Sequence, residues 1–338
     1  MAVFTEVAFE AAAALVETLD IGTLTRLEPI QGGIENTNYF CDTTGGRHVL
    51  TLFERLSAAE LPFYLGLMRH LADQGLPVPG PKANGAGEIV LALGGKPAAV
   101  VDRLPGEHHL APDDADCASV GTMLAGLHVA ASGFPLVQQS ARGLAWWQTT
   151  VPKVLPHLGA EQRALMEDEL AFQTELAASA AYRSLPRGPI HGDLFRDNVL
   201  FDGPTLVGVF DFYFAGVDTL LFDIAVALND WCVDLESGRL VEERAEDLVD
   251  AYETVRPLEP QEMRLLPALM RAAAFRFWVS RAADLHLPRR ALVLVPHDPA
   301  HFERVLRRRR EAPWHPEHHR ASADLPPDTQ AGHLADAP

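Results

Sequence analysis

A polar run near the middle of the chain constrains the fold more than any other feature. Residues 191–198 read His-Gly-Asp-Leu-Phe-Arg-Asp-Asn, and Asp211-Phe212 follows thirteen residues later. The apolar residues between these sites predict two short strands joined at a turn, Asp202-Gly203-Pro204. Such a hairpin returns Asp211 to the neighbourhood of Asn198, so that one metal ion can contact both side chains.

An acid, an amide and a second acid placed in this way form the set that phosphoryl transfer from ATP requires. Asp193 lies one loop earlier, on the acceptor side, where its carboxylate can orient an acceptor hydroxyl and take its proton. Asn198 and Asp211 can hold Mg²⁺ on the phosphates. The alternative is a loop of capping residues, and the complete pattern favours phosphotransfer over it.

The same run carries a family resemblance. It is similar to the His-Arg-Asp and Asp-Phe-Gly motifs of protein kinases, with Gly192 replacing the arginine and Tyr213 replacing the glycine. This variant resembles the kinase-like small-molecule phosphotransferases, which include aminoglycoside, choline and homoserine kinases. The resemblance implies an α+β, bilobal protein-kinase-like fold, with a small antiparallel β lobe and a larger, mainly helical lobe. It also implies ATP and Mg²⁺ as cofactors.

The apolar pattern along the chain agrees with two lobes. Five candidate strands and one helix at 58–74 are predicted between residues 24 and 104, and helices dominate after residue 113. We expect an N-terminal nucleotide-binding lobe at 1–103 and a C-terminal catalytic and acceptor-binding lobe at 104–311. Residues 312–338 lack periodicity and are expected to form a mobile tail.

Composition limits the partners of the chain. Its 338 residues carry a formal net charge of −18, which argues against nucleic acid and anionic membranes. The basic run Arg307–Arg310 is interpreted as a solvated helix end. No apolar run reaches the ~18 residues of a membrane span, no signal peptide is visible, and three cysteines without metal spacing suit a reducing compartment. We therefore expect a cytoplasmic protein of unspecified oligomeric state.

The predicted nucleotide side begins at the glycine pair Gly32-Gly33, between the first two strands. A tight glycine turn lets backbone N–H groups approach phosphates closely, although two glycines in a hairpin are often only a turn. The strand that ends at the interlobe connection would then supply backbone groups to the adenine. The predicted nucleotide contacts are Gly32, Gly33, Asn36, Asn38, Thr51, Val101 and Arg103.

Lysine is nearly absent from the chain, with three lysines against 25 arginines. The family pattern places a phosphate-binding lysine or arginine on the third strand, where this chain has Thr51. Either Mg²⁺ and another cation replace it, with Arg47, Arg55 and Lys96 as candidates, or the chain is a nucleotide-binding pseudokinase. The complete acid–amide–acid set argues against the second reading.

Longer segments narrow the resemblance to one group. The bacterial homoserine kinases of the kinase-like type are closely similar in residues 33–40, 49–54, 61–68, 229–232, 275–281 and 284–289. The resemblance covers most of the chain and includes the threonine on the third strand. It implies L-homoserine as the acceptor and threonine biosynthesis as the setting. A related acceptor, such as choline, ethanolamine, hydroxylysine or an aminoglycoside, is the alternative.

Homoserine carries an ammonium, a carboxylate and a hydroxyl, so its pocket needs acids and a cation. Asp230 is a candidate for the ammonium, although Asp223, Asp230 and Asp234 share a helix face that could simply be solvated. Arg276 and Arg281 are candidates for the carboxylate. They are about 140° apart on their helix, so we expect one to bind the ligand and the other to form an ion pair.

The catalytic loop supplies two further candidates. Arg196 and Asp197 lie between the predicted base and the metal ligand Asn198, and are expected to border the acceptor and Mg²⁺. Asp223 could brace this loop. His191 is expected to brace it too, by bonding to the backbone, because Asp193 has the better geometry for the base.

Overall fold

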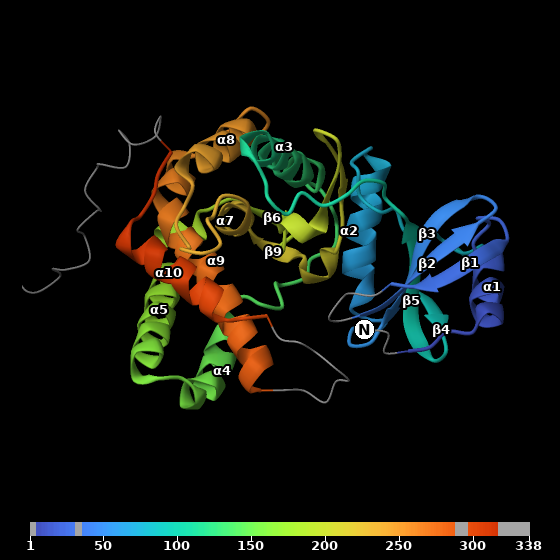
Figure 1. The fold of residues 1–338 in the computed structure, drawn as a ribbon, viewed down its shortest axis with the longest axis horizontal. Helices are drawn as coiled ribbons and strands as arrows, with labels where there is room; N and C mark the ends of the chain where they lie inside the picture. Colours follow the sequence, from blue (N-terminus) through green and yellow to red (C-terminus); the bar gives the residue numbers. More distant parts are fainter. Residues whose placement is uncertain (1–4, 31–35, 288–296, 317–338) are drawn as a thin grey trace, which may run out of the picture.

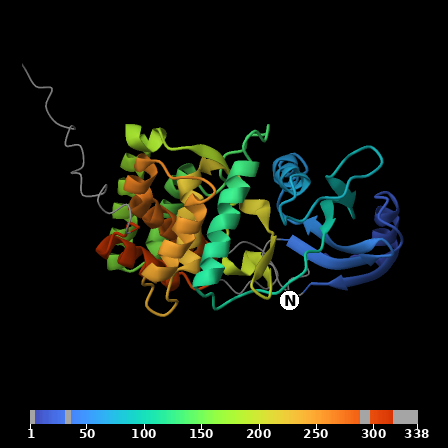
Figure 2. The same ribbon diagram turned by 90° about the horizontal axis from the view of Figure 1, so that it is seen from above.

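The computed structural model describes residues 5–30, 36–287 and 297–316 and has two lobes side by side (Figures 1 and 2). The smaller lobe is built on a five-stranded antiparallel sheet of strand order β1-β2-β3-β5-β4. Its strands are β1 (Leu24–Pro29), β2 (Asn36–Thr43), β3 (Gly46–Phe53), β4 (Leu91–Leu93) and β5 (Lys96–Asp102). The predicted kinase-like fold, with an antiparallel β lobe and a helical lobe, is confirmed.

Alternate residues of this sheet serve its two faces. On β3, Leu50 and Leu52 belong to a small core that also contains Ala12 and Val16 of helix α1 (Phe9–Glu17). The residues between them face the other way, and Thr51 lines a cavity between the lobes. One strand therefore stabilises the small lobe with one face and forms part of a binding surface with the other.

Helix α2 (Leu61–Asp73) lies between the sheet and the larger lobe (Figures 1 and 2). Its buried residues, among them Tyr64 and Met68, belong to the main core, which continues through the larger lobe. β5 ends at Asp102 and the next helix begins at Asp114. The predicted lobe boundary at residue 103 falls in this connection and stays a prediction.

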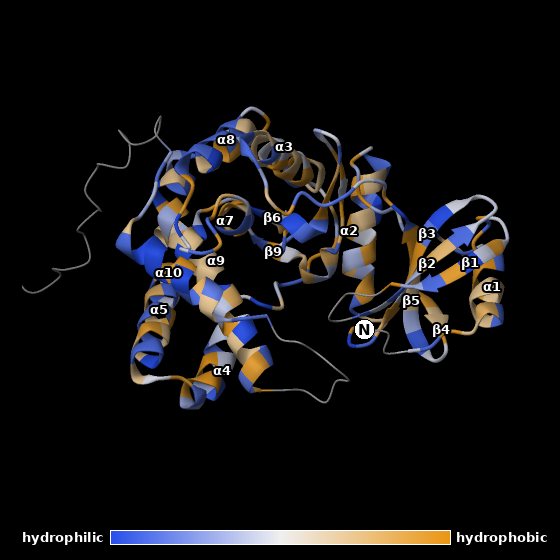
Figure 3. Cartoon of the chain, viewed as in Figure 1, coloured by the Kyte–Doolittle hydropathy of each residue, from blue (hydrophilic) through white to orange (hydrophobic). Residues whose placement is uncertain are grey.

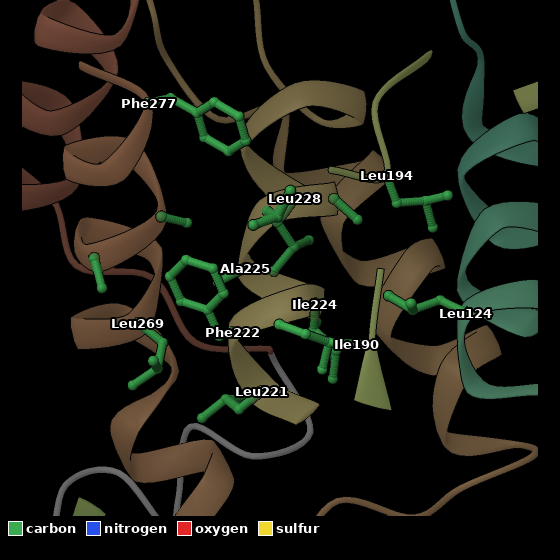
Figure 4. Close-up of a cluster of buried hydrophobic side chains, with 14 of the residues drawn as sticks. Leu124, Ile190, Leu194, Leu221, Phe222, Ile224, Ala225, Leu228, Leu269 and Phe277 are labelled. Carbon is green, nitrogen blue, oxygen red and sulfur yellow. The ribbon is translucent and has the colours of Figure 1, made fainter. Parts of the chain in front are cut away.

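The larger lobe is mainly helical and is packed around α7, in which every residue from Leu221 to Trp231 is buried. Figure 4 shows apolar side chains of α7 gathered with Leu269 and Phe277 of α9 and Leu124 of α3. The helices are α3 (Asp114–Ala130), α4 (Leu144–Val154), α5 (Ala160–Ala178), α6 (Ala180–Arg183), α7 (Leu220–Trp231), α8 (Glu242–Glu253), α9 (Pro260–His286) and α10 (Ala300–Glu311). The predicted tail begins just after α10, and residues 317–338 lie outside the described residues.

Two short antiparallel pairs interrupt the helices of this lobe. β7 (Val199–Asp202) and β8 (Thr205–Val209) form the predicted hairpin. β6 (Arg187–Ile190) pairs with β9 (Gly216–Thr219), a pairing that the sequence does not predict. These two pairs bracket the polar run at residues 191–198 and hold it at the interlobe side of the larger lobe.

The basic run Arg307–Arg310 lies on α10, which is mostly hydrophilic in Figure 3. Arg307 pairs with Glu303, and Arg310 pairs with Asp168. Arg309 is buried and donates from Nε to Asn229 Oδ1 at 2.9 Å. The interpretation of the run as a solvated helix end is therefore wrong for Arg309, which is part of the interior. No helix in the described part of the chain is long and apolar enough to cross a membrane.

The contact between α3 and α8 gives a stability prediction. A Cβ atom at Gly121 would lie 2.0 Å from the backbone oxygen of Leu248, so Gly121→Ala must push the two helices apart. We expect a loss of about 3 kcal/mol in the free energy of unfolding. The control on the same helix is Gly126→Ala, whose Cβ would lie 3.7 Å from a flexible side-chain atom of Leu76.

The free energy of unfolding of the control variant should be unchanged or higher by up to ~1 kcal/mol, because alanine has a higher helix propensity than glycine. Urea denaturation of both variants measures the difference. Equal midpoints for the two variants would contradict the close packing of α3 on α8.

Candidate active site

A cavity with a volume of about 740 Å³ lies between the two lobes. It collects most of the side chains that the sequence singled out. The predicted site residues that line it are Asn36, Asn38, Thr51, Val101, Arg103, Asp193, Asp197, Asn198, Asp211, Arg276 and Arg281. Gly32 and Gly33 lie outside the described residues, so the predicted phosphate turn stays a prediction.

The loop that carries Asp193 is held by a buried carboxylate on α7. Asp223 is 0% exposed and accepts the backbone N–H groups of His191 at 2.7 Å and Gly192 at 2.8 Å. Its Oδ2 also lies 3.2 Å from His128 Nε2. Burial alone would raise the pKa of Asp223, but these partners lower it, so the carboxylate stays charged. Asp223 therefore braces the catalytic loop.

Gly192 shows why the loop needs a glycine where protein kinases have arginine. Its φ is 75°, a left-handed conformation that favours glycine. A Cβ atom there would lie 2.9 Å from the backbone oxygen of Phe214. The loop thus passes directly against the segment that follows Asp211, which no larger residue would allow.

His191 connects the two halves of the site. Its Nδ1 accepts the Asp193 N–H at 3.2 Å, and its Nε2 donates to the Phe210 carbonyl at 2.9 Å. A neutral ring has one donor and one acceptor nitrogen, as these bonds require. Burial lowers the pKa of His191, which favours that neutral form. His191 therefore braces the loop through the backbone, as expected, and is not the base.

Asn198 is oriented by the loop that precedes it. Its Nδ2 donates to the Asp193 backbone oxygen at 2.8 Å and lies 3.3 Å from Asp193 Oδ2, which leaves the amide oxygen for a ligand. The Phe210 N–H donates to the Asn198 carbonyl at 3.1 Å, so the hairpin brings Asp211 beside Asn198.

An amide oxygen and a carboxylate suit Mg²⁺, which takes oxygen ligands and usually binds one or two protein groups together with phosphates. In the described ranges there is no cluster of three or more His, Cys, Asp or Glu side chains that could hold a metal ion alone. The donor set therefore fits a metal that shares its ligands with a bound nucleotide.

Arg276 and Arg281 both line the cavity, although they are not on one helix face. Arg276 is 3% exposed, and its Nη1 lies 3.2 Å from Asp193 Oδ1. It is therefore the arginine of the ion pair, and its partner is the predicted base. Arg281 lies farther along α9 and donates to a backbone oxygen, that of Asp298, at 3.3 Å. Its position leaves it as the better candidate for a ligand carboxylate.

Arg196 and Asp230 do not line the cavity. The backbone N–H and Nε of Arg196 donate to Asp230 Oδ2 at 2.8 Å and 3.1 Å, and its Nη1 donates to the Leu110 carbonyl. Burial raises the pKa of Asp230 and the Arg196 charge opposes that rise. The pair therefore lies behind the loop that carries Asp193, and not at the cavity wall. Asp223 and Asp230 thus belong to a buried helix face and not to a solvated one.

Asp197, like Asp193, is an acid of this loop that lines the cavity. It is accessible from the cavity, and the surrounding protein and the charge of Asp193 raise its pKa. A cationic ligand group would remove this unfavourable interaction between the two carboxylates. Asp197 is therefore better placed than Asp230 to meet an ammonium.

None of the three candidate replacements for the strand lysine is found at the cavity wall. Lys96 pairs with Glu54 and bonds Thr5, and Arg47 is largely exposed near Asp42. Arg55 does not line the cavity either.

The structure adds lining residues that the sequence interpretation missed, among them Arg142 and Asp284. Arg276, Ser280 and Asp284 are spaced i, i+4, i+8 on α9, a signal that could have identified Asp284 as facing the cavity. Arg142 precedes α4 and has no such signal, since its placement depends on the distant strand β9, where Gln139 bridges to Val217.

Comparison with known proteins identifies the family of this site. The model of the phosphotransferase enzyme family matches residues 26–266. A homoserine kinase from Polaromonas naphthalenivorans is 60% identical over 93% of this chain and 99% of its own length. A homoserine kinase from Janthinobacterium sp. is 50% identical over 92% of this chain and 97% of its own. The chain therefore belongs to the phosphotransferase enzyme family, and within it to the group of the homoserine kinases.

A solved structure supports the same fold at much lower sequence identity. Amicoumacin kinase hAmiN, determined in complex with AMP-PNP and Ca²⁺, superposes with a TM-score of 0.66 at 15% identity. The superposition covers 90% of this chain and 93% of that one. The fold is thus shared with kinases of small molecules.

The brace on the catalytic loop can be tested by Asp223→Asn. The amide nitrogen would face a backbone N–H donor, so we expect kcat to fall at least tenfold and the free energy of unfolding to drop by about 2–3 kcal/mol. Asp234→Asn is the matched control, because Asp234 follows α7, is exposed and bonds Ser237. An ADP-release assay and thermal unfolding measure both effects, and a normal kcat in Asp223→Asn would contradict the brace.

Proposed function

We propose that this chain transfers the γ-phosphoryl group of ATP to the hydroxyl of L-homoserine, giving O-phospho-L-homoserine and ADP in threonine biosynthesis. The observation that carries the proposal is the convergence of Asp193, Asn198 and Asp211 on one interlobe cavity. The 60% identity to a homoserine kinase over 93% of the chain supports the choice of acceptor.

The proposed chemistry depends on alignment at Asp193. Its carboxylate orients the acceptor hydroxyl and takes the proton as the oxygen attacks the γ-phosphorus. Arg276 and Asn198 fix this carboxylate, since both bond to it. Asn198 and Asp211 would hold Mg²⁺, which neutralises phosphate charge when bound. Because the transition state of phosphoryl transfer is loose, most of the rate comes from positioning and from charge neutralisation.

On the nucleotide side, the sheet and the connection between the lobes supply the contacts. Asn36, Asn38 and Thr51 line the cavity from β2 and β3, and Val101 lines it from the end of β5. Arg103 follows β5, and its guanidinium lies over the Phe40 ring at 3.8 Å from the centroid. These residues would border ATP, with the adenine at the backbone of residues 101–103.

On the acceptor side, one acid and one arginine line the cavity together with Asp193. Asp197 would bind the ammonium of homoserine, and Arg281 its carboxylate, while Arg276 stays paired with Asp193. Asp284 is a second acid near Arg281 on the same helix. The acceptor would thus be recognised by two opposite charges that line the same cavity as Asp193.

The partners proposed for the chain are small molecules, in the cytoplasm. A net charge of −18 repels nucleic acid and anionic lipid. The one basic run is paired with acids of the protein or buried. Three buried free cysteines suit a reducing compartment.

The role of Asp193 gives a sharp prediction. Asp193→Ala should reduce turnover by at least ~10³-fold, since the base and its alignment of the hydroxyl are both lost. ATP binding should survive, because the nucleotide contacts lie on the other side of the cavity. Asp202→Ala, at the exposed turn of the β7–β8 hairpin that follows this loop, is the control and should remain fully active. Normal turnover in Asp193→Ala would remove Asp193 from the mechanism.

The acceptor is tested with a panel in the ADP-release assay. The panel contains L-homoserine, D-homoserine, L-serine, choline, ethanolamine and kanamycin. Selective turnover of L-homoserine is expected. Turnover of another compound would keep the phosphotransfer chemistry and reject the acceptor. Binding of ATP without turnover of any compound would favour the pseudokinase alternative.

Two truncated acceptors separate the charges of the pocket. 3-Amino-1-propanol is homoserine without its carboxylate, and 4-hydroxybutanoate is homoserine without its ammonium. Arg281→Met should lower kcat/KM for homoserine about 10- to 100-fold, as expected for one charge-assisted hydrogen bond, and barely affect 3-amino-1-propanol. Asp197→Asn should also lower kcat/KM for homoserine about 10- to 100-fold, and should leave kcat/KM for 4-hydroxybutanoate almost unchanged. Equal losses on the full and truncated acceptors would contradict these contacts.

A further inference from the structure

The buried carboxylate of Asp223, which braces the loop of Asp193, also has a partner outside that loop. Its Oδ2 lies 3.2 Å from Nε2 of His128 on α3, and the two side chains are 0% and 1% exposed. The second ring nitrogen of His128, Nδ1, lies 2.8 Å from the hydroxyl of Tyr252, a buried residue of α8. His128 therefore joins the brace to a helix that contributes no residue to the cavity wall.

The contacts continue beyond Tyr252. Arg256 donates from Nη1 to the Tyr252 hydroxyl oxygen at 3.2 Å. The same guanidinium donates to both carboxylate oxygens of Glu262, at 3.0 Å and 3.1 Å, in the two-bond geometry that orients an arginine most strongly. Glu262 is 0% exposed and also accepts the Glu259 N–H at the start of α9. A line of hydrogen-bonded side chains thus runs through the interior from the start of α9 to Asp223.

The charges at the two ends of this line fix the direction of each hydrogen bond. Ionised Asp223 can only accept, so Nε2 of His128 carries a proton. In the neutral ring Nδ1 then accepts, and the Tyr252 hydroxyl is the donor to it. A doubly protonated ring would place a second cationic donor on the oxygen that already accepts from Arg256. Burial raises the pKa of Tyr252 more than Arg256 lowers it, so the hydroxyl keeps its proton.

The direction is important because His128 can support the carboxylate in one tautomer only. Which ring nitrogen holds the proton is set by the hydrogen bond that the other nitrogen makes. With the proton on Nδ1, the lone pair of Nε2 would face Asp223 and repel it. The oxygen that faces Nε2 is Oδ2, which also accepts the His191 N–H. A displacement of this oxygen would therefore displace the loop on which Asp193 is carried.

We propose that Tyr252 and His128 are positioning residues for phosphoryl transfer. The hydroxyl of Tyr252 selects the His128 tautomer that donates to Asp223, and Asp223 in turn holds the loop of Asp193. The proposal deepens the proposed function and rests on Asp193 as its base. It gives α8, which has no residue at the cavity wall, an influence on the rate of the reaction.

The first test is kinetic. Tyr252→Phe keeps the buried ring and removes only the hydroxyl. We expect kcat to fall about three- to tenfold, the size expected for one neutral hydrogen bond, with unchanged KM values for ATP and homoserine. His128→Leu removes a donor to a charged group and should lower kcat about 10- to 100-fold. His128→Gln, whose amide N–H groups can still donate to Asp223, should recover most of that loss.

A control and a double-mutant cycle separate this role from a general loss of packing. Tyr39→Phe removes a buried tyrosine hydroxyl that donates to the Thr5 carbonyl in the small lobe, and it should leave kcat unchanged. In the His128→Leu background, Tyr252→Phe should have no further effect on kcat, because the connection to Asp223 is already interrupted. Independent losses that multiply, or a rise in KM at normal kcat, would overturn the proposal.

The tautomer of His128 is measured without any substrate. The ring nitrogen shifts in an NMR spectrum, assigned by their loss in His128→Gln, should show a protonated Nε2 and an unprotonated Nδ1. These shifts should change in Tyr252→Phe and stay constant in Tyr39→Phe. A proton on Nδ1 in the wild-type chain would contradict the proposal. Failure of that chain to phosphorylate homoserine would reject the proposed acceptor, and the tautomer would still decide the inference.

Discussion

The geometry of the site depends on one buried interaction, the acceptance of two consecutive loop N–H groups by the carboxylate of Asp223. A buried carboxylate is tolerated only when its charge is met by donors, and here the donors are the backbone on which Asp193 is carried. His191, whose N–H is one of these donors, then bonds both the Asp193 N–H and the Phe210 carbonyl. Asp193 and the strand that ends just before Asp211 are therefore fixed to one helix, α7, in the middle of the core.

A second constraint is electrostatic. The cavity is lined by five acids, Asp102, Asp193, Asp197, Asp211 and Asp284, in a chain of net charge −18 with three lysines. Arginines provide the positive charge, and α9 supplies two of them to the cavity. Arg276 is committed to Asp193 by an ion pair, so that acid is neutralised before any ligand binds. Asp197 has no such partner in the contacts described, and its raised pKa reflects the charge of Asp193 beside it.

Local patterns in the sequence were sufficient for the hairpin that brings Asn198 and Asp211 together, whereas the fold was predicted from the family resemblance. Apolar runs and turn residues predicted β7 and β8, and the helices expected after residue 113 are present in the larger lobe. The β6–β9 pairing was not predictable, because each strand has four residues and the two are separated by 25 others. Helix periodicity correctly put Asp223 and Asp230 on one face. Periodicity could not show that this face is buried. The backbone N–H groups that donate hydrogen bonds to the two carboxylates come from a loop about 30 residues earlier in the chain.

The same limit explains why the two arginines of α9 could not be assigned from spacing alone. The angle between positions 276 and 281 shows that the two side chains leave the helix on different faces. The partner of each side chain is set by tertiary packing. The same limit applies to Thr51. When only its strand is considered, this threonine indicates that a lysine has been lost. In the structure Thr51 is buried on the cavity side of β3, and its Oγ1 donates to Asn38 Oδ1 at 2.7 Å, so the position carries a neutral hydrogen-bonded pair and not a cation.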